Sequence, residues 1–230
     1  KPDVVLTYTI KPNVYGGLAC RLFRIPYIAN ITGLGTSIEN KGALRTISLF
    51  LYKVGLKKAH AVFFQNISNK EYFTKNRIVS EKISREIPGS GVNIDYHIFE
   101  EYPTNDDTIK FLFIGRIMKS KGIDELLEAA QIIKTIYPNT EFHLVGAKEE
   151  NYDAKLNTLI KKGIIYYHGR QEDVRYFIKM CHATINPSYH EGMSNVLLES
   201  ASTGRPVLVS NIPGCKETFD EGISGFGFEV

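Results

Sequence analysis

Short apolar runs alternate with longer amphipathic stretches along almost all of the 230 residues. The apolar runs are rich in Val, Ile and Phe and lack strict alternation, which is typical of parallel strands covered on both faces. The amphipathic stretches have the period of helices. Repeated strand–helix units predict an α/β protein built on doubly wound parallel sheets.

The pattern gives each element an approximate range. Strands are expected at 3–9, 26–32, 61–66, 110–115, 140–146, 164–168, 183–187 and 206–210, with a last apparent strand at 226–230. Helices are expected at 12–24, 42–59, 68–77, 122–136, 151–162, 172–181 and 194–203, with a weaker helical pattern at 215–220.

A domain boundary is expected near residue 105. Residues 87–92 are turn-rich, and residues 100–108 are polar with Pro103 and paired aspartates. Residues 1–105 then form a partial Rossmann-like domain with a linker, and residues 106–230 form a nearly complete one. Only about three strands precede the boundary, too few for a doubly wound sheet. Because the chain also opens directly on a strand pattern, we interpret it as a piece of a longer protein.

Charge and cysteine content indicate the partners and the cellular compartment to expect. Residues 1–105 carry 14 Lys and Arg against 8 Asp and Glu, whereas residues 106–230 carry 14 against 17. The basic half is the better candidate for meeting an anionic partner or membrane surface. The scattered Cys20, Cys181 and Cys215 predict a reducing, cytoplasmic setting and neither disulfides nor a zinc site. No apolar run approaches the roughly 20 residues that span a bilayer.

The loop at 115–122 follows the first strand of the second domain and leads into a helix. It carries Arg116 and Lys121, and ligands of open α/β sheets bind outside the carboxyl ends of the strands. Two cations beside a helix N-terminus suit a diphosphate. A plain solvated loop explains these residues equally well.

The segment 186–199 carries a more specific pattern. A strand ends, a turn carries Glu191 and Gly192, and Ser194 or Asn195 can cap a new helix that contains Glu199. Eight helical residues rise about 12 Å, which is more than the separation of cooperating hydrolytic carboxylates. The pair is better suited to holding two parts of a long ligand by its hydroxyl groups. On spacing alone, a turn residue and a surface helix residue remain the favoured interpretation.

The order of these motifs resembles a known family. The chain contains Gly115-Arg116 and Lys121-Gly122, then Glu191 and Glu199 in the spacing E-x7-E, and then the runs GRPV at 204–207 and PG at 213–214 before Glu217. This is similar to the retaining glycosyltransferases of family 4, which have the GT-B fold of two Rossmann-like domains. Segments 11–16, 32–35 and 88–93 are most similar to bacterial enzymes that build capsular polysaccharide and lipopolysaccharide.

The resemblance implies a donor site for a UDP-sugar. Arg116 and Lys121 would bind the diphosphate and stabilise the leaving group, Glu191 would hold the transferred sugar, and Glu199 the ribose. These roles make Arg116, Lys121 and Glu191 the implied catalytic residues. The implied donor-binding residues are Gly115, Arg116, Lys121, His168, Gly169, Arg170, Glu191, Gly192, Met193, Ser194, Asn195 and Glu199, with the base near 168–170.

The resemblance also implies the reaction. A hexose or N-acetylhexosamine would pass to a growing glycan with retention of configuration, through front-face attack that needs no protein nucleophile. No metal or other cofactor and no nucleic acid is implied. The partners would be the nucleotide-sugar donor and a glycan or lipid-linked glycan acceptor. Thr32 stands where many relatives have a donor-contacting His, and the Gly-rich acceptor loop is absent, so a non-catalytic nucleotide-sugar binding module stays open as the alternative.

Motifs that would indicate another class of nucleotide-binding protein are incomplete. Thr32-Gly33-Leu34-Gly35 resembles a dinucleotide fingerprint, but Ile38 stands where its third glycine belongs, and no GK[ST] loop is present. His190 is interpreted as close to the sugar. The histidines interpreted as structural are His60, His97, His143 and His182.

The segment from Lys41 to His60 is a basic amphipathic helix that could lie on the inner face of the cell membrane. A covering helix with a solvated basic face is the favoured interpretation.

Overall fold

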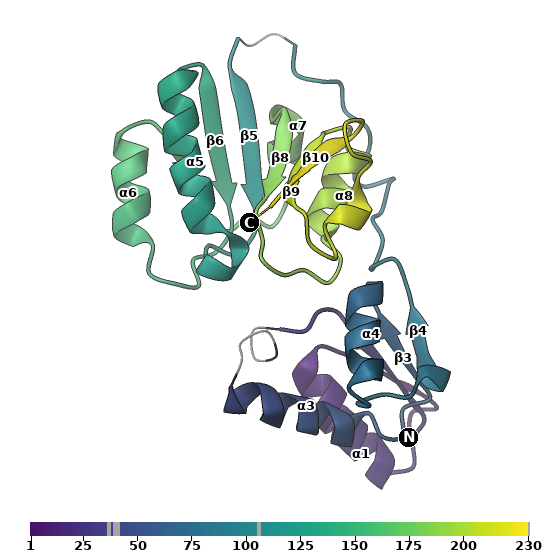
Figure 1. Cartoon of the computed structure of the whole chain (residues 1–230). Coiled ribbons are helices and arrows are strands. Elements are labelled where there is room, and N and C mark those ends of the chain that lie inside the picture. The colour runs from purple at the N-terminus through teal and green to yellow at the C-terminus, as the bar shows by residue number, and fades with distance from the viewer. Residues whose placement is uncertain (36–37, 39–41, 105–106, 230) are drawn as a thin grey trace. The chain divides into compact units, whose positions relative to one another are not determined.

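The chain folds into two compact units in a computed structural model that describes residues 1–35, 38, 42–104 and 107–229. One unit comprises Lys1–Ser90 with the short stretch His190–Met193, and the other comprises Gly91–Tyr189 with Ser194–Val230 (Figure 1). We call them the N-terminal and C-terminal units. The domain boundary expected at residues 105 and 106 lies outside the described residues.

The N-terminal unit contains a four-stranded parallel sheet in the order β1-β2-β3-β4. Its elements are β1 (Val5–Tyr8), α1 (Gly17–Leu22), β2 (Tyr27–Ile31), α3 (Ala43–Gly55), β3 (Ala61–Phe64), α4 (Ile67–Lys75) and β4 (Ser84–Glu86). Aromatic rings fill the core beneath the helices, where Phe73 meets Tyr52 and Phe64 edge-on with ring centroids 5.1 and 5.3 Å apart.

The C-terminal unit contains a six-stranded parallel sheet in the order β10-β9-β8-β5-β6-β7. Its strands are β5 (Ile109–Ile114), β6 (Thr140–Val145), β7 (Ile165–Tyr167), β8 (Ala183–Asn186), β9 (Val207–Ser210) and β10 (Gly225–Phe228). Its helices are α5 (Ile123–Ile136), α6 (Asp153–Lys161), α7 (Arg175–Met180) and α8 (Asn195–Ser202).

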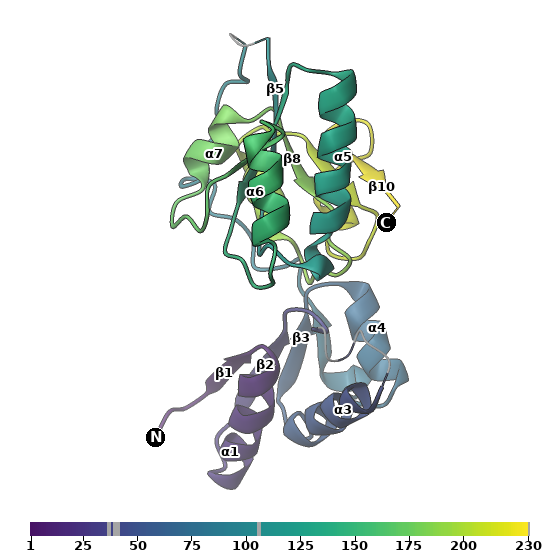
Figure 2. The ribbon, with the colours of Figure 1, turned by 90° about the vertical axis from the view of Figure 1, so that its left-hand side faces the viewer.

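Helices cover both faces of this second sheet. On one face, α5 and α6 lie side by side (Figure 2) and pack against Phe113 and Phe142. On the other face, α7 packs against Leu112 and Val145, and Ser200 of α8 hydrogen-bonds Thr184 at 2.8 Å. Successive residues 111–114 of β5 pack into the cores on opposite faces, which is why this part of the strand is apolar throughout. The doubly wound arrangement expected from the sequence is confirmed.

The predicted elements differ from the observed ones in a few places. Strand β4 was not predicted, because its residues Ser84, Arg85 and Glu86 are polar and its run is short. The expected helix at 12–24 begins as a π-helical segment, Pro12–Gly16, before α1. The pattern at 215–220 gives only a 3₁₀ turn, Lys216–Thr218.

The three cysteines are free and buried. Among the residues that the structure describes, none of the helices combines the length and apolar character needed to cross a bilayer.

Arg205, two residues before β9, is only 2% exposed although it carries a charge. Its Nε donates to the backbone carbonyl of Ile178 at 3.2 Å. Its two terminal nitrogens donate at 2.8–3.3 Å to the backbone carbonyls of Glu100, Glu101, Thr203 and Lys179. The five N–H groups of a guanidinium form a rigid fork, so one side chain satisfies carbonyls from three separate segments.

We expect Arg205→Ala to lower the free energy of unfolding by about 3 kcal/mol, because it leaves several buried carbonyls without a donor. Urea denaturation measures this change. Arg170→Ala, at an exposed arginine of the same unit, is the control and is expected to leave the midpoint unchanged. Equal midpoints for the two variants would contradict the structural role of Arg205.

Candidate functional site

The predicted donor residues of the C-terminal unit follow strands β5, β7 and β8, which end at one edge of the sheet. Strand β5 is followed by α5 on one face, whereas β8 is followed by α8 on the other. The chain therefore leaves these neighbouring strands in opposite directions. Such a switch point at the carboxyl edge is where open α/β sheets bind ligands.

Backbone hydrogen bonds to β6 and the residues after it hold the loop that follows β5. Gly115 N donates to Val145 O at 2.9 Å, and Ile117 N donates to Ala147 O at 2.8 Å. A 3₁₀ turn, Lys119–Lys121, then leads to Gly122, whose φ of 68° is left-handed. Within this loop Arg116 is exposed and Lys121 is half-buried.

The loops after β5 and β8 touch directly. A Cβ on Gly122 would lie 2.0 Å from the carbonyl oxygen of Pro187, so only glycine fits there. Tyr189 N donates to Ser120 O at 3.1 Å, and the Tyr189 hydroxyl donates to Glu125 at 2.6 Å. The cation-bearing loop and the segment leading to Glu191 are therefore fixed to one another up to Tyr189.

A second close approach links the ends of β5, β6 and β7. A Cβ on Gly146, which has a φ of 151°, would lie 1.7 Å from Gly115 O. Gly146 N donates to Gly169 O at 2.8 Å. The predicted diphosphate loop and the predicted base segment thus meet across a glycine that sequence reasoning did not select.

His168 is oriented by a chain of polar groups along the sheet. Its Nε2 lies 2.9 Å from His143 Nδ1, and His143 Nε2 lies 3.1 Å from a Glu141 oxygen. The two rings are nearly parallel, at 3°, with centroids 5.2 Å apart. Burial lowers the pKa of both imidazoles, which favours the neutral form of each ring. The 2.9 Å separation of the two nitrogens then fits one N–H···N hydrogen bond between the rings.

The start of α8 is anchored from two sides. Asn186 Nδ2 donates to Ser194 Oγ at 3.0 Å, and Ser194 N donates to Gly214 O at 2.9 Å. Ser194 occupies the N-cap position, but its hydroxyl makes no capping bond to the helix. The first-turn N–H groups thus keep the anion-attracting character of a helix N-terminus.

Glu199 lies on the second turn of α8 and is half-buried. Burial raises the pKa of its carboxyl group, and the nearby His97 opposes that rise. The distance from His97 Nε2 to Glu199 Oε1 is 4.0 Å. A desolvated carboxylate beside an imidazole is typical of a ligand-binding position.

Two models of known protein families match this chain. Residues 96–230 match the family model described as glycosyl transferases group 1. The chain belongs to this family. Residues 1–66 match the model described as glycosyl transferase 4-like.

Two curated relatives of this chain are named for sugars linked to diphosphoundecaprenol. The Campylobacter jejuni N,N'-diacetylbacillosaminyl-diphospho-undecaprenol alpha-1,3-N-acetylgalactosaminyltransferase is 28% identical over 97% of the chain and 62% of the relative. The Escherichia coli UDP-Gal:alpha-D-GlcNAc-diphosphoundecaprenol alpha-1,3-galactosyltransferase is 25% identical over 100% of the chain and 63% of the relative. The chain thus spans less than two thirds of the length of these curated relatives.

Solved structures share the fold of this chain. Anabaena HepE in complex with UDP-glucose superposes with a TM-score of 0.82 at 19% identity, covering 99% of the chain and 65% of HepE. Sucrose-phosphate synthase from Thermosynechococcus elongatus gives 0.79 at 19% identity, covering 99% and 60%. The expected GT-B fold is confirmed.

Most of the predicted donor residues lie in one unit of the structure. Those of the C-terminal unit are Gly115, Arg116, Lys121, His168, Gly169, Arg170, Ser194, Asn195 and Glu199. Glu191, Gly192 and Met193 instead fall on the stretch that groups with the N-terminal unit. No group of three or more His, Cys, Asp or Glu suited to a metal ion occurs within the described part of the chain.

Sequence reasoning missed three supporting residues. Gly146 could have been found as a glycine directly after a strand of the second domain. His143 was interpreted as structural, and it does support His168 from within the sheet. His97 received the same interpretation, but its neighbour is Glu199. No local motif around His97 could have indicated a partner about 100 residues away.

We expect Glu199→Gln to stabilise the protein at pH 7. Because burial raises the folded-state pKa of Glu199 above its ordinary 4.5, its favourable contribution is full below the unfolded pKa and is lost as pH rises through the folded pKa. The neutral amide removes that loss, so a Tm gain of about 2 °C is expected by calorimetry at pH 7 and none at pH 4. Glu172→Gln, at an exposed position, is the control, and an equal gain at both pH values would contradict the cause given.

Proposed function

We propose that the protein is a retaining glycosyltransferase that moves a hexose or N-acetylhexosamine from a UDP-sugar to a growing glycan in bacterial surface polysaccharide synthesis. The observation that carries this proposal is the joining of loop 115–122 to segment 187–189 at the β5–β8 switch point. It supports a diphosphate site beside the start of α8.

Each predicted donor residue receives a role. Arg116 and Lys121 bind the diphosphate, and the first-turn amides of α8 add neutral donors. Glu199 accepts hydrogen bonds from the ribose hydroxyls, and residues 168–170 border the base. Glu191, Gly192 and Met193 hold the transferred sugar.

The transfer itself needs few protein groups. The acceptor hydroxyl oxygen attacks the anomeric carbon on the face that the diphosphate leaves, so the configuration is retained. The bond from that carbon to the phosphate oxygen breaks, and the hydroxyl proton passes to the departing phosphate. Arg116 and Lys121 stabilise the negative charge that develops on UDP, which is electrostatic catalysis by preplaced groups.

The names of the relatives favour a lipid-linked acceptor. Both the Campylobacter jejuni and the Escherichia coli enzyme are named for diphosphoundecaprenol-linked sugars. We infer an acceptor of that class, a glycan on a lipid diphosphate, for this protein. A cytoplasmic position at the inner face of the membrane follows from such an acceptor.

Calorimetry with UDP tests the donor site. We expect Glu199→Ala to raise the Kd for UDP about 30-fold, because it removes a charged acceptor of ribose hydrogen bonds. Glu191→Ala is expected to keep that Kd within about threefold, because UDP lacks the transferred sugar, and to lower kcat for transfer. Equal losses of UDP affinity in both variants would contradict this division of roles.

The same measurements separate enzyme from binding module. A glycosyltransferase binds UDP and turns over a UDP-sugar with an acceptor extract, whereas a non-catalytic module binds UDP without turnover. Absence of UDP binding by the wild-type protein rejects both.

Helix α3 of the N-terminal unit has features of a membrane-contacting surface. Leu44, Ile47 and Phe50 lie one turn apart and are 62%, 54% and 64% exposed. Lys53 on the same helix and Lys57 and Lys58 just after it are exposed as well. An exposed apolar stripe beside lysines suits an anionic lipid surface. The favoured sequence interpretation, a covering helix with a solvated basic face, does not by itself explain that apolar stripe. Lys41 lies outside the described residues.

We expect the protein to co-sediment with vesicles containing 30% anionic lipid and to be released by reversing Lys57 and Lys58 to Glu. Each lysine near such a surface contributes about 1 kcal/mol, so the double reversal should weaken binding by more than tenfold. Reversal of Lys161 and Lys162, an exposed pair at the end of α6, is the matched control. Sedimentation that ignores anionic lipid, or equal loss in both variants, would remove membrane contact from the proposal.

A further inference from the structure

A segment of the C-terminal unit that precedes β5 is hydrogen-bonded to the end of α8. We call residues 93–101 the strap. The Ser202 hydroxyl donates to His97 O, Glu100 N donates to Thr203 O at 3.2 Å, and Arg205 donates to the carbonyls of Glu100 and Glu101. The strap therefore runs along the carboxyl half of α8, the helix that carries Glu199.

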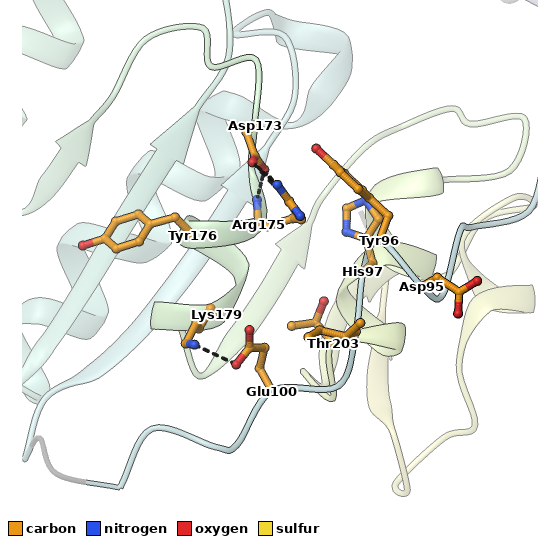
Figure 3. A pocket seen from close by; sticks show the side chains of 10 residues that line it. Asp95, Tyr96, His97, Glu100, Asp173, Arg175, Tyr176, Lys179 and Thr203 are labelled. Atoms are coloured by element: carbon orange, nitrogen blue, oxygen red, sulfur yellow. Dashed lines mark hydrogen bonds and ion pairs between the residues drawn. The ribbon is translucent and has the colours of Figure 1, made fainter.

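The strap is also tied to α7. Lys179 and Glu100 form an ion pair at 2.8 Å, and the Arg175 guanidinium lies 3.8 Å from the centre of the Tyr96 ring. Between the strap and α7 lies a cavity of about 360 Å³, into which Figure 3 shows these side chains facing. The strap is thus fixed by specific polar contacts at its edges, while part of its inner surface is not filled by packing.

His97 is the strap residue placed against the proposed nucleotide site. Its side chain is 9% exposed and lines the cavity. Its Nε2 lies 4.0 Å from Glu199 Oε1, whereas its buried Nδ1 has no hydrogen-bond partner. A buried imidazole usually satisfies its ring nitrogens, so the placement of His97 calls for an explanation other than core packing.

Charge gives that explanation. At 4.0 Å the contact is too long for a hydrogen bond, but an imidazole at that distance still acts electrostatically on a carboxylate in a partly desolvated position. Desolvation disfavours ionised Glu199, and the electrostatic influence of His97 favours it. An ionised carboxylate is the form that accepts hydrogen bonds through both oxygens.

We propose that His97 is a positioning residue for the donor: the strap carries its imidazole to Glu199, where it keeps the carboxylate ionised and aimed at the ribose hydroxyls. This inference rests on the proposed function, in which Glu199 binds the ribose. It assigns to the connecting segment a part in nucleotide recognition that its sequence does not suggest.

A double-mutant cycle measured by UDP calorimetry tests the coupling. We expect His97→Ala to raise the Kd for UDP about tenfold when Glu199 is present. In a Glu199→Ala background the same substitution should change the Kd by less than about twofold, because the group it acts through is gone. Equal fold-changes in the two backgrounds, or no change in either, would overturn the proposal.

Two further variants exclude a general loss of structure. His97→Gln keeps a polar side chain but cannot become cationic, so it is expected to raise the Kd for UDP about as much as His97→Ala while leaving the Tm near that of wild type. Wild-type UDP affinity in this variant would overturn the proposal. His182→Ala removes another buried imidazole of the same unit, whose Nδ1 accepts from Lys110 N at 3.0 Å, far along the sheet from the carboxyl edge. It should lower the Tm without changing the Kd for UDP, and a tenfold loss of UDP affinity there would also overturn the proposal.

Kinetics with a UDP-sugar gives a second readout. His97→Ala should raise the KM for the donor by about the same factor as the Kd for UDP and leave kcat within twofold. A lower kcat at unchanged KM would count against positioning of the ribose carboxylate. Failure of the wild-type protein to bind UDP would instead reject the proposed function, so the two failures are distinguishable.

Discussion

A single buried guanidinium joins the parts of the C-terminal unit that matter most for its site. Arg205 donates to carbonyls of the strap, of α7 and of the end of α8. No carboxylate is among those hydrogen-bond partners, and burial lowers the pKa of the group. A charge in such a place is tolerated because carbonyl dipoles replace water around it. Lysine could not replace it, because its ammonium has three donors rather than a planar fork of five.

At the carboxyl edge of the sheet, backbone segments lie so close together that only glycine fits between them. Gly122 lies against Pro187, and Gly146 lies against Gly115, at distances that exclude any side chain. The loops after β5, β6, β7 and β8 are therefore ordered by backbone contact before any ligand arrives. Because this main chain is already fixed, the loop that carries Arg116 and Lys121 would lose little backbone entropy on binding the proposed diphosphate.

The sequence predicted the regular elements and the chemistry of the loops better than the supports behind them. Apolar runs located the strands of the larger sheet because each is covered on both faces, whereas β4 escaped because Ser84, Arg85 and Glu86 carry no apolar pattern. The motif around Glu199 is local, but its spacing alone favoured a plain turn residue and a surface helix residue, and the predicted ribose role came from the family resemblance. His97 and Arg205 act through partners up to 105 residues away in the chain, and no periodicity encodes such contacts.

The proposed ribose-binding role of Glu199 sets function against stability at this edge. A carboxylate on the second turn of a helix is normally solvated, but here burial works against its ionised form. An amide would be more stable there and would lose the charged acceptor that ribose hydroxyls prefer. The chain keeps the carboxylate and places His97 beside it, which offsets part of the desolvation. Because His97 stands on the strap, that compensation depends on Arg205 and Ser202 holding the strap in place. The proposed ribose-binding residue, the imidazole beside it and the arginine that holds the strap therefore depend on one another.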